Sequence, residues 1–266
     1  MSLDHVQEVF GRLLGGRYTK PNYGYVSGDL NALHNYAAIQ GCNYPEMTLI
    51  FSTLDFLGFL MKPDQTLPTL SYQDLSRELP TYPEIKDDPV YIEVKNNFRS
   101  NYRSNNNLQF MLEKCLGDSS DTMNEYNEKE IRNLLIEVYR NGLTHQVAPK
   151  GMGTIRFDPR QPSAPPLRQD GHPMLMYVSS PTGQFVLNIG RFGDDVRELL
   201  VDIVDTFRRG NENKIVRNTG RTVQSMVDEM SRRLHMIRWA NSTVRDKSDY
   251  DKIKSFLRSI SLQTSM

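Results

Sequence analysis

The apolar positions of residues 128–146 recur with the spacing of a helix. Five of them fall on one face: Ile131, Leu134, Leu135, Val138 and Leu143. Apolar residues three, four and seven positions apart share a face of an α-helix. Glu128 and Glu130 suit the positive end of the helix dipole, and Pro149 cannot continue the helix. This segment is the clearest amphipathic helix that the sequence predicts.

Similar patterns predict further helices over residues 30–40, 46–62, 91–117 (broken near 104–107), 196–209, 222–241 and 250–260. Residues 46–62 are apolar on more than one face, which is typical of a central helix in a bundle. Asp29 is expected to cap the helix over 30–40. Asp194 or Asp195 is expected to cap the helix that ends at Gly210. Residues 63–89 contain several prolines and are expected to form a loop.

Alternating apolar positions predict one β-hairpin. Two apolar stretches within 174–192 flank a Pro-Thr-Gly turn at 181–183, and a proline-rich linker precedes them at 158–173. The expected fold is therefore mainly α. It is a helical bundle in a single domain over 1–266, with the linker and hairpin inserted at 158–192 and C-terminal helices over 194–266.

Composition narrows the function classes. The chain has 266 residues with 32 basic and 32 acidic side chains, so no global positive field would steer a nucleic acid or a membrane to it. No apolar run reaches the length of a membrane span, and the N-terminus lacks the pattern of a signal peptide. We expect a cytoplasmic protein with two reduced cysteines. The histidines and cysteines show no metal-ligand spacing, so neither a metal nor a cofactor is expected.

Candidate chemistry lies at the end of the helix over 128–146. Arg140, Asn141 and His145 occur within six residues of one another. On an ideal α-helix Asn141 and His145 share a face, whereas Arg140 and His145 are about 140° apart. These two side chains can converge only on something that spans them, such as a groove between two helices or a ligand phosphate. Arginine can bind a phosphate and histidine can move a proton near neutral pH. Capping and packing at a helix C-terminus is the alternative.

The segment "LLIEVYRNGLTHQVAPKG" resembles the signature of the HEPN superfamily, the helical domains named for higher eukaryotes and prokaryotes nucleotide-binding. The shared motif is Arg, a polar residue, a short spacer and His, which here are Arg140, Asn141 and His145. A preceding apolar helix with Asp-Phe-Leu-Gly, Asp55 to Gly58, resembles a bacterial group of such proteins. The resemblance covers about residues 30–155.

This resemblance implies a helical bundle that forms a homodimer, with two motifs in a shared cleft. Many members are metal-independent endoribonucleases of bacterial defence or toxin–antitoxin systems. His145 would then be the general acid or base, Arg140 would stabilise phosphate charge and Asn141 would orient the phosphate. The partners implied are RNA or a nucleotide, and an antitoxin or regulatory protein. A non-catalytic module that binds a nucleotide, RNA or protein is the alternative.

Other residues could support this site. Asp55 could align Arg140, or it could be a buried acid paired locally. Lys150 could add a phosphate contact. Residues 207–247 hold ten basic and four acidic residues, 10 − 4 = +6, near Trp239. This stretch is a solvated helix face, an RNA-binding surface or a patch for an acidic partner. Five arginines would then contact nucleic acid: Arg208, Arg209, Arg232, Arg233 and Arg238.

Overall fold

A computed structural model describes residues 3, 6–7, 9–10, 25–63, 70–80, 84–118, 124–146, 148–151, 153–157, 174–178, 183–208, 211–241 and 251–258. Contacts divide the chain into two compact units. Unit 1 comprises Met1–Pro63 and Arg103–Ser231, and unit 2 comprises Asp64–Tyr102 and Arg232–Met266. Each unit is described by itself. The single domain over 1–266 stays a prediction.

Helices account for 75% of the described residues, which confirms the prediction of a mainly α protein. The helices of unit 1 are α2 (Tyr25–Gln40), α3 (Asn43–Met61), α6 (Ser104–Phe110), α7 (Lys129–Leu134), α8 (Asn141–Gln146), α9 (Ile189–Arg208) and the first part of α10 (Val223–Ala240). Two π-helical turns extend α6 and α7, Met111–Leu116 and Leu135–Arg140. Short 3-10 turns occupy Glu125–Asn127 and Arg217–Thr219. The break predicted near 104–107 falls slightly earlier, at Tyr102 and Arg103, and residues 104–107 are the first turn of α6.

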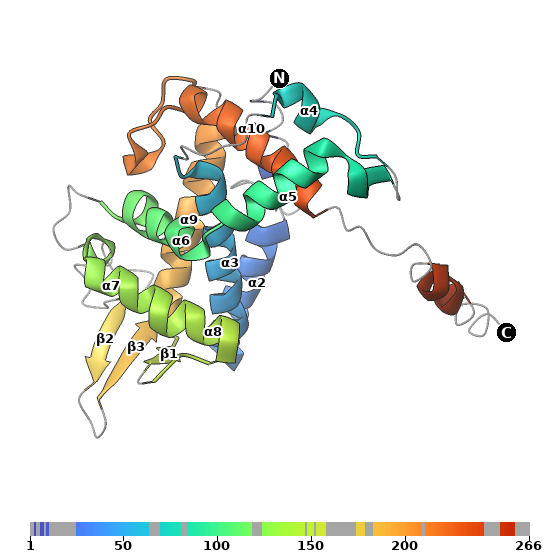
Figure 1. The fold of residues 1–266 in the computed structure, drawn as a ribbon. Coiled ribbons are helices and arrows are strands. Elements are labelled where there is room, and N and C mark those ends of the chain that lie inside the picture. The colour runs from blue at the N-terminus through green and yellow to red at the C-terminus, as the bar shows by residue number, and fades with distance from the viewer. Residues whose placement is uncertain are drawn as a thin grey trace. The chain divides into compact units, whose positions relative to one another are not determined.

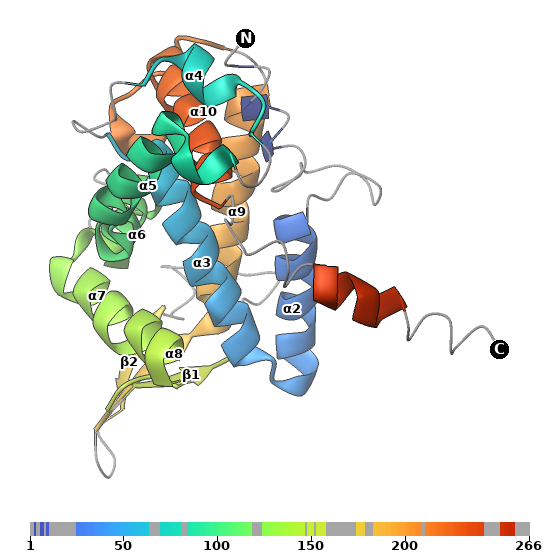
Figure 2. The same ribbon diagram turned by 45° about the vertical axis from the view of Figure 1, so that its right-hand side comes forward.

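Helix α3 is the central helix of unit 1, as its apolar sequence predicts. Its apolar side chains at Met47, Ile50, Leu54, Leu57 and Leu60 have no exposed surface. It packs against α2, α6 and α9, and both views show these helices beside it (Figures 1 and 2). Because these helices cover α3 on several sides, apolar side chains on more than one of its faces are buried away from water.

One glycine sets the distance between α3 and α6. A Cβ atom on Gly58 would lie 2.3 Å from the backbone oxygen of Asn107, far closer than real Cβ contacts. One turn earlier on α3, Asp55 Oδ1 accepts a hydrogen bond from Asn107 Nδ2 at 3.0 Å. Two residues of the Asp-Phe-Leu-Gly segment therefore meet the same residue of α6.

The β structure is a three-stranded sheet rather than a hairpin alone. The strands are β1 (Gly153–Arg156), β2 (Leu175–Val178) and β3 (Gln184–Asn188), in the order β1-β3-β2. The antiparallel pairing of β2 with β3 confirms the predicted hairpin, and β1 adds a parallel partner to β3. The linker at 158–173 lies outside the described residues. Strand β1 is only four residues long, which is too short for a clear alternation.

Residues 189–192 were predicted as strand, and this is wrong because α9 begins at Ile189. Asn188 Oδ1 accepts a hydrogen bond from the amide of Arg191 at 3.3 Å, the bond of a helix N-cap. The prediction that Asp194 or Asp195 caps this helix is wrong for the same reason. Asp29 is likewise inside α2, which begins at Tyr25.

Asp195 instead belongs to a buried polar network at the start of α9. Its Oδ2 accepts a hydrogen bond from the hydroxyl of Tyr126 at 2.8 Å. Burial, and then the charge of Asp195, raise the pKa of Tyr126. The guanidinium of Arg191 lies 3.8 Å from Asp195 and 3.7 Å from Glu125. The carboxylate of Glu125 accepts hydrogen bonds from the backbone amides of Met174 and Leu175, where β2 begins. The network therefore joins α9 to the sheet.

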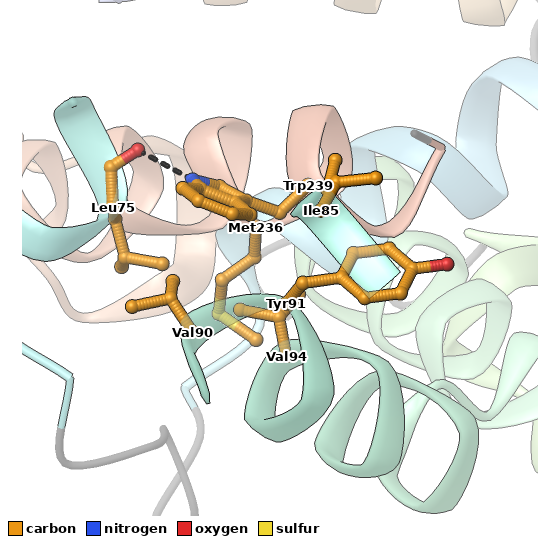
Figure 3. Close-up of a cluster of buried hydrophobic side chains, with 7 residues drawn as sticks. All are labelled: Leu75, Ile85, Val90, Tyr91, Val94, Met236 and Trp239. Carbon is orange, nitrogen blue, oxygen red and sulfur yellow. Dashed lines mark hydrogen bonds between the residues drawn. The ribbon is translucent and has the colours of Figure 1, made fainter. Parts of the chain in front are cut away.

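Unit 2 has a core of its own, formed by α4 (Tyr72–Ser76), α5 (Pro89–Asn101), a 3-10 turn at Glu84–Asp87 and the end of α10. Figure 3 shows seven buried side chains: Leu75, Ile85, Val90, Tyr91, Val94, Met236 and Trp239. The Trp239 indole donates a hydrogen bond to the Leu75 carbonyl at 2.8 Å (Figure 3). The prediction of a loop or surface excursion over 63–89 is therefore wrong for Tyr72–Ser76 and Glu84–Asp87, which are helical. The capping box between Ser71 and Asp74 is the sequence signal of α4 that was missed.

The Gly58 contact predicts a large effect of one methyl group. Gly58→Ala should lower the free energy of unfolding of unit 1 by about 1–3 kcal/mol or more, because backbone atoms of α6 must move. Urea unfolding followed by far-UV circular dichroism measures the change. Ser52→Ala, at an exposed position of the same helix, is the control and should change stability little. Equal stability of Gly58→Ala and Ser52→Ala would contradict the close contact.

The cysteines predict a difference in thiol reactivity. Burial raises the pKa of Cys115 from 9.0 to about 12, whereas Cys42 is half-exposed. At pH 8 the native protein should therefore react with a thiol reagent quickly at Cys42, and at Cys115 only on unfolding, because the thiolate is the nucleophile. Labelling with and without urea, read by mass spectrometry, tests this. Rapid labelling of native Cys115 would disagree with its burial.

Candidate functional site

The helix that carries the Arg-Asn-x3-His segment contains a π-helical turn. The turn covers Leu135–Arg140, and the amide of Asn141 donates to the carbonyl of Ile136 five residues earlier. Arg140 therefore ends the π turn, and α8 starts at Asn141. The angle of about 140° between Arg140 and His145 assumed an ideal α-helix and does not hold across this junction. Asn141 and His145 both lie in α8, one α-helical turn apart.

Arg140 and Asn141 are joined directly. Arg140 Nη1 donates a hydrogen bond to Asn141 Oδ1 at 2.7 Å. Asn141 Nδ2 in turn donates to Glu137 Oε2 at 3.1 Å. Asn141 is 9% exposed and Arg140 is half-buried, while Glu137 faces solvent. The side-chain amide of Asn141 thus orients the guanidinium of Arg140. Glu137, which accepts the hydrogen bond from that amide, was not identified from the sequence.

His145 lies in the backbone of α8, and its side chain is outside the described residues. Two of the three predicted site residues, Arg140 and Asn141, are therefore brought into contact by the structure. The third is placed by its backbone alone, in the next turn of the helix.

The chain after α8 folds back onto the same helix. The amide of Lys150 donates to the Val138 carbonyl at 2.9 Å. A Cβ atom on Gly142 would lie 2.5 Å from the Ala148 oxygen and 2.7 Å from the Lys150 nitrogen. The glycine of Arg-Asn-Gly is thus required by this close approach, which places the half-buried Lys150 beside the motif helix.

Tyr139 fixes the opposite side of the motif helix to the sheet. Its hydroxyl donates to the Phe185 carbonyl of β3 at 2.7 Å, and its side chain has no exposed surface. Burial raises the pKa of Tyr139. The aromatic residue between Val138 and Arg140 is therefore an anchor that holds the motif helix to β3.

Asp55 is paired within the bundle. The hydrogen bond from Asn107 supports the alternative in which Asp55 is a locally satisfied acid. No described contact joins it to Arg140, so its role in aligning Arg140 stays a prediction.

A groove of about 640 Å³ opens between α2 and α3. Leu33, Tyr44, Pro45 and Leu49 line it, and Leu143 of α8 closes part of it. Asp29, Thr48 and Ser52 add polar groups. The groove was not predicted, because its lining combines the consecutive helices α2 and α3 with Leu143 of α8, which is distant from them in sequence.

A second polar cluster was also missed. His34 of α2 lies with Nδ1 2.6 Å from Glu46 Oε1 of α3, and with Nε2 3.4 Å from Asp194 Oδ1 of α9. Glu46 has no exposed surface, and Arg197 lies 3.1 Å from Asp194. The cluster ties three helices together. Within the described parts of the chain, no group of three or more His, Cys, Asp or Glu side chains is arranged to hold a metal ion.

The five arginines expected to contact nucleic acid are divided between the two units. Arg208 is exposed in unit 1, and Arg209 lies outside the described residues. In unit 2, Arg238 is exposed and Arg232 donates to the Leu70 carbonyl at 3.0 Å. Arg233 is 1% exposed and Trp239 is buried. The surface role expected for Arg233 is therefore wrong, because its side chain packs inside.

Comparison of the chain with protein-family models, with curated proteins and with solved structures gives no match. Among the helices that the structure describes, none has both the length and the apolar character needed to cross a membrane. Cytoplasmic localisation stays a prediction.

The fold-back of residues 148–150 predicts the effect of Gly142→Ala. The added methyl group should displace Lys150 and lower the free energy of unfolding by about 1–3 kcal/mol, as overpacking does. Amide hydrogen exchange should be faster at Lys150, which loses its bond to Val138. Asn133→Ala, at an exposed position of the same long helix, is the control. Unchanged exchange at Lys150 in Gly142→Ala would refute the contact.

Proposed function

We propose that this chain is a HEPN-like protein that cleaves RNA without a metal ion, through Arg140, Asn141 and His145. The observation that carries the proposal is the hydrogen bond from Arg140 to Asn141 at the start of α8. It holds a guanidinium beside the helical turn that contains His145. A π-helical turn adjoins this point, and such turns are frequent at functional sites.

The chemistry assigns one role to each residue. His145 removes the proton of the ribose 2′-hydroxyl or protonates the leaving 5′-oxygen. Arg140 stabilises the charge that develops on the phosphate, and Asn141 keeps the guanidinium in place. The 2′-oxygen bonds to phosphorus as the bond to the 5′-oxygen breaks, so the products are a cyclic phosphate and a 5′-hydroxyl. Lys150 adds positive charge beside this helix.

The proposal includes a homodimer in which two such motifs share a cleft, as the resemblance implies. It also includes control by an antitoxin or regulatory protein, with RNA as the substrate. The zero net charge of the chain means that attraction of RNA depends on local groups such as Arg140 and Lys150.

A non-catalytic binding module is the second candidate, and one observation favours it. Glu137 binds the amide that holds Arg140, so an acid lies next to the guanidinium. A nearby carboxylate offsets part of the positive charge that a phosphorane-like transition state needs. In that case the site binds a nucleotide, RNA or a protein and performs no chemistry.

An RNA cleavage assay in EDTA separates the two candidates. Wild-type protein should cleave RNA and leave cyclic phosphate ends. His145→Ala should lower the rate about 10²- to 10⁴-fold, the usual contribution of general acid–base catalysis. Arg140→Ala should lower it about 10²- to 10³-fold, as the loss of a group that stabilises transition-state charge does. Mass spectrometry of the products identifies the ends.

Lys129→Ala is the matched control, because it removes one exposed positive charge at the other end of the same long helix. It should cleave at the wild-type rate. Cleavage that survives His145→Ala and Arg140→Ala would show that the site assignment is wrong. An absence of cleavage over varied RNAs would favour the binding module.

A further inference from the structure

We infer that the groove between α2 and α3 is a subsite for an unpaired guanine base. This inference rests on the proposed function, because it takes the phosphate attached to that base to lie at Arg140. It adds a specificity for the base, which the Arg-Asn-x3-His segment does not supply.

The first argument is the lining of the groove. A nucleobase is a flat ring with apolar faces and polar edges, so it needs an apolar slot with polar groups at the rim. Leu33, Pro45 and Leu49 give the apolar walls, while Thr48 and Ser52 give hydroxyl groups. The volume of about 640 Å³ is in the range of small-molecule sites.

Tyr44 supplies the stacking surface. It lines the groove and is 41% exposed. Accessible aromatic side chains are the usual stacking platforms for unpaired bases. Tyr36 of α2 is even more exposed but does not line the groove.

The second argument is the distance to the motif. Leu143 lines the groove and lies three residues after Arg140 in the same helical segment. The groove therefore adjoins the helical segment that carries Arg140, where the proposed function places the phosphate.

The third argument is charge. Asp29 is the acidic residue in the lining, and Leu143 is the residue that the lining takes from the helical segment that carries Arg140. A carboxylate has two acceptor oxygens and no donor when ionised. Guanine presents two neighbouring donors, N1–H and the 2-amino group, and so matches Asp29 best. The two ends of guanosine 3′-monophosphate thus meet groups of complementary chemistry.

Titration calorimetry with guanosine 3′-monophosphate, inosine 3′-monophosphate and inorganic phosphate tests the inference. Wild-type protein should bind the guanosine compound most tightly. Tyr44→Ala should weaken this binding about 5- to 100-fold, the range of base–aromatic stacking, while Tyr36→Ala should not. Inosine lacks the 2-amino group, so it should bind about 10-fold more weakly to wild type. Asp29→Asn should remove that difference.

Equal affinities for guanosine 3′-monophosphate and inorganic phosphate would overturn the inference. Equal effects of Tyr44→Ala and Tyr36→Ala would overturn it as well. Loss of self-association in Tyr44→Ala, with nucleotide affinity unchanged, would overturn it and assign the groove to a protein surface. Circular dichroism of each variant confirms that it is folded.

The cleavage assay in EDTA, run on the same preparations, separates this inference from the proposed function. Tyr44-dependent guanosine binding without cleavage would support the base subsite and reject the nuclease. RNA cleavage that does not depend on the base would support the nuclease and reject the base subsite.

Discussion

The close contact between Gly58 and the backbone of Asn107 is the constraint on which unit 1 depends. It brings α6 against α3 at a distance that no side chain allows, and Asp55 adds a hydrogen bond to the same residue. Helix α3 is thereby buried against α2, α6 and α9. The Asp-Phe-Leu-Gly segment is thus first a helix-packing element, because its acid and its glycine contact one residue of a neighbouring helix.

The motif helix is held on two sides. Tyr139 binds β3 through its hydroxyl, and residues 148–150 return over Gly142. These contacts fix the point where the π turn ends and α8 begins, so Arg140 and Asn141 meet there. Rigid support of this kind is what a preorganised site requires. The same support would also serve a purely structural helix end, so the proposed chemistry rests on His145.

Unit 2 changes how the basic sequence over 207–247 is interpreted. Its apparent cluster of charge is divided between the two units, and its tryptophan belongs to a core in which Arg77 lies 5.2 Å from the ring centroid. Arg233 is buried and Arg232 is held by a carbonyl. Positive residues that are close in sequence therefore differ in exposure, because a helix distributes its side chains over its whole circumference.

The sequence by itself determined the mainly α class, the positions of the long helices and the hairpin of β2 with β3, because apolar periodicity is a local property of the chain. It also indicated Arg140, Asn141 and His145 as neighbours on one helix. It did not identify the N-cap at Asn188, whose local signal was outweighed by the apolar residues around it, nor the short strand β1. Only the tertiary structure decided the π turn that ends at Arg140 and the hydrogen bond of Glu137 to Asn141. It also decided the cluster of His34, Glu46 and Asp194 and the groove beside Leu143. The geometry of these features is set by packing between segments of the chain, and such packing produces no periodic pattern in the sequence.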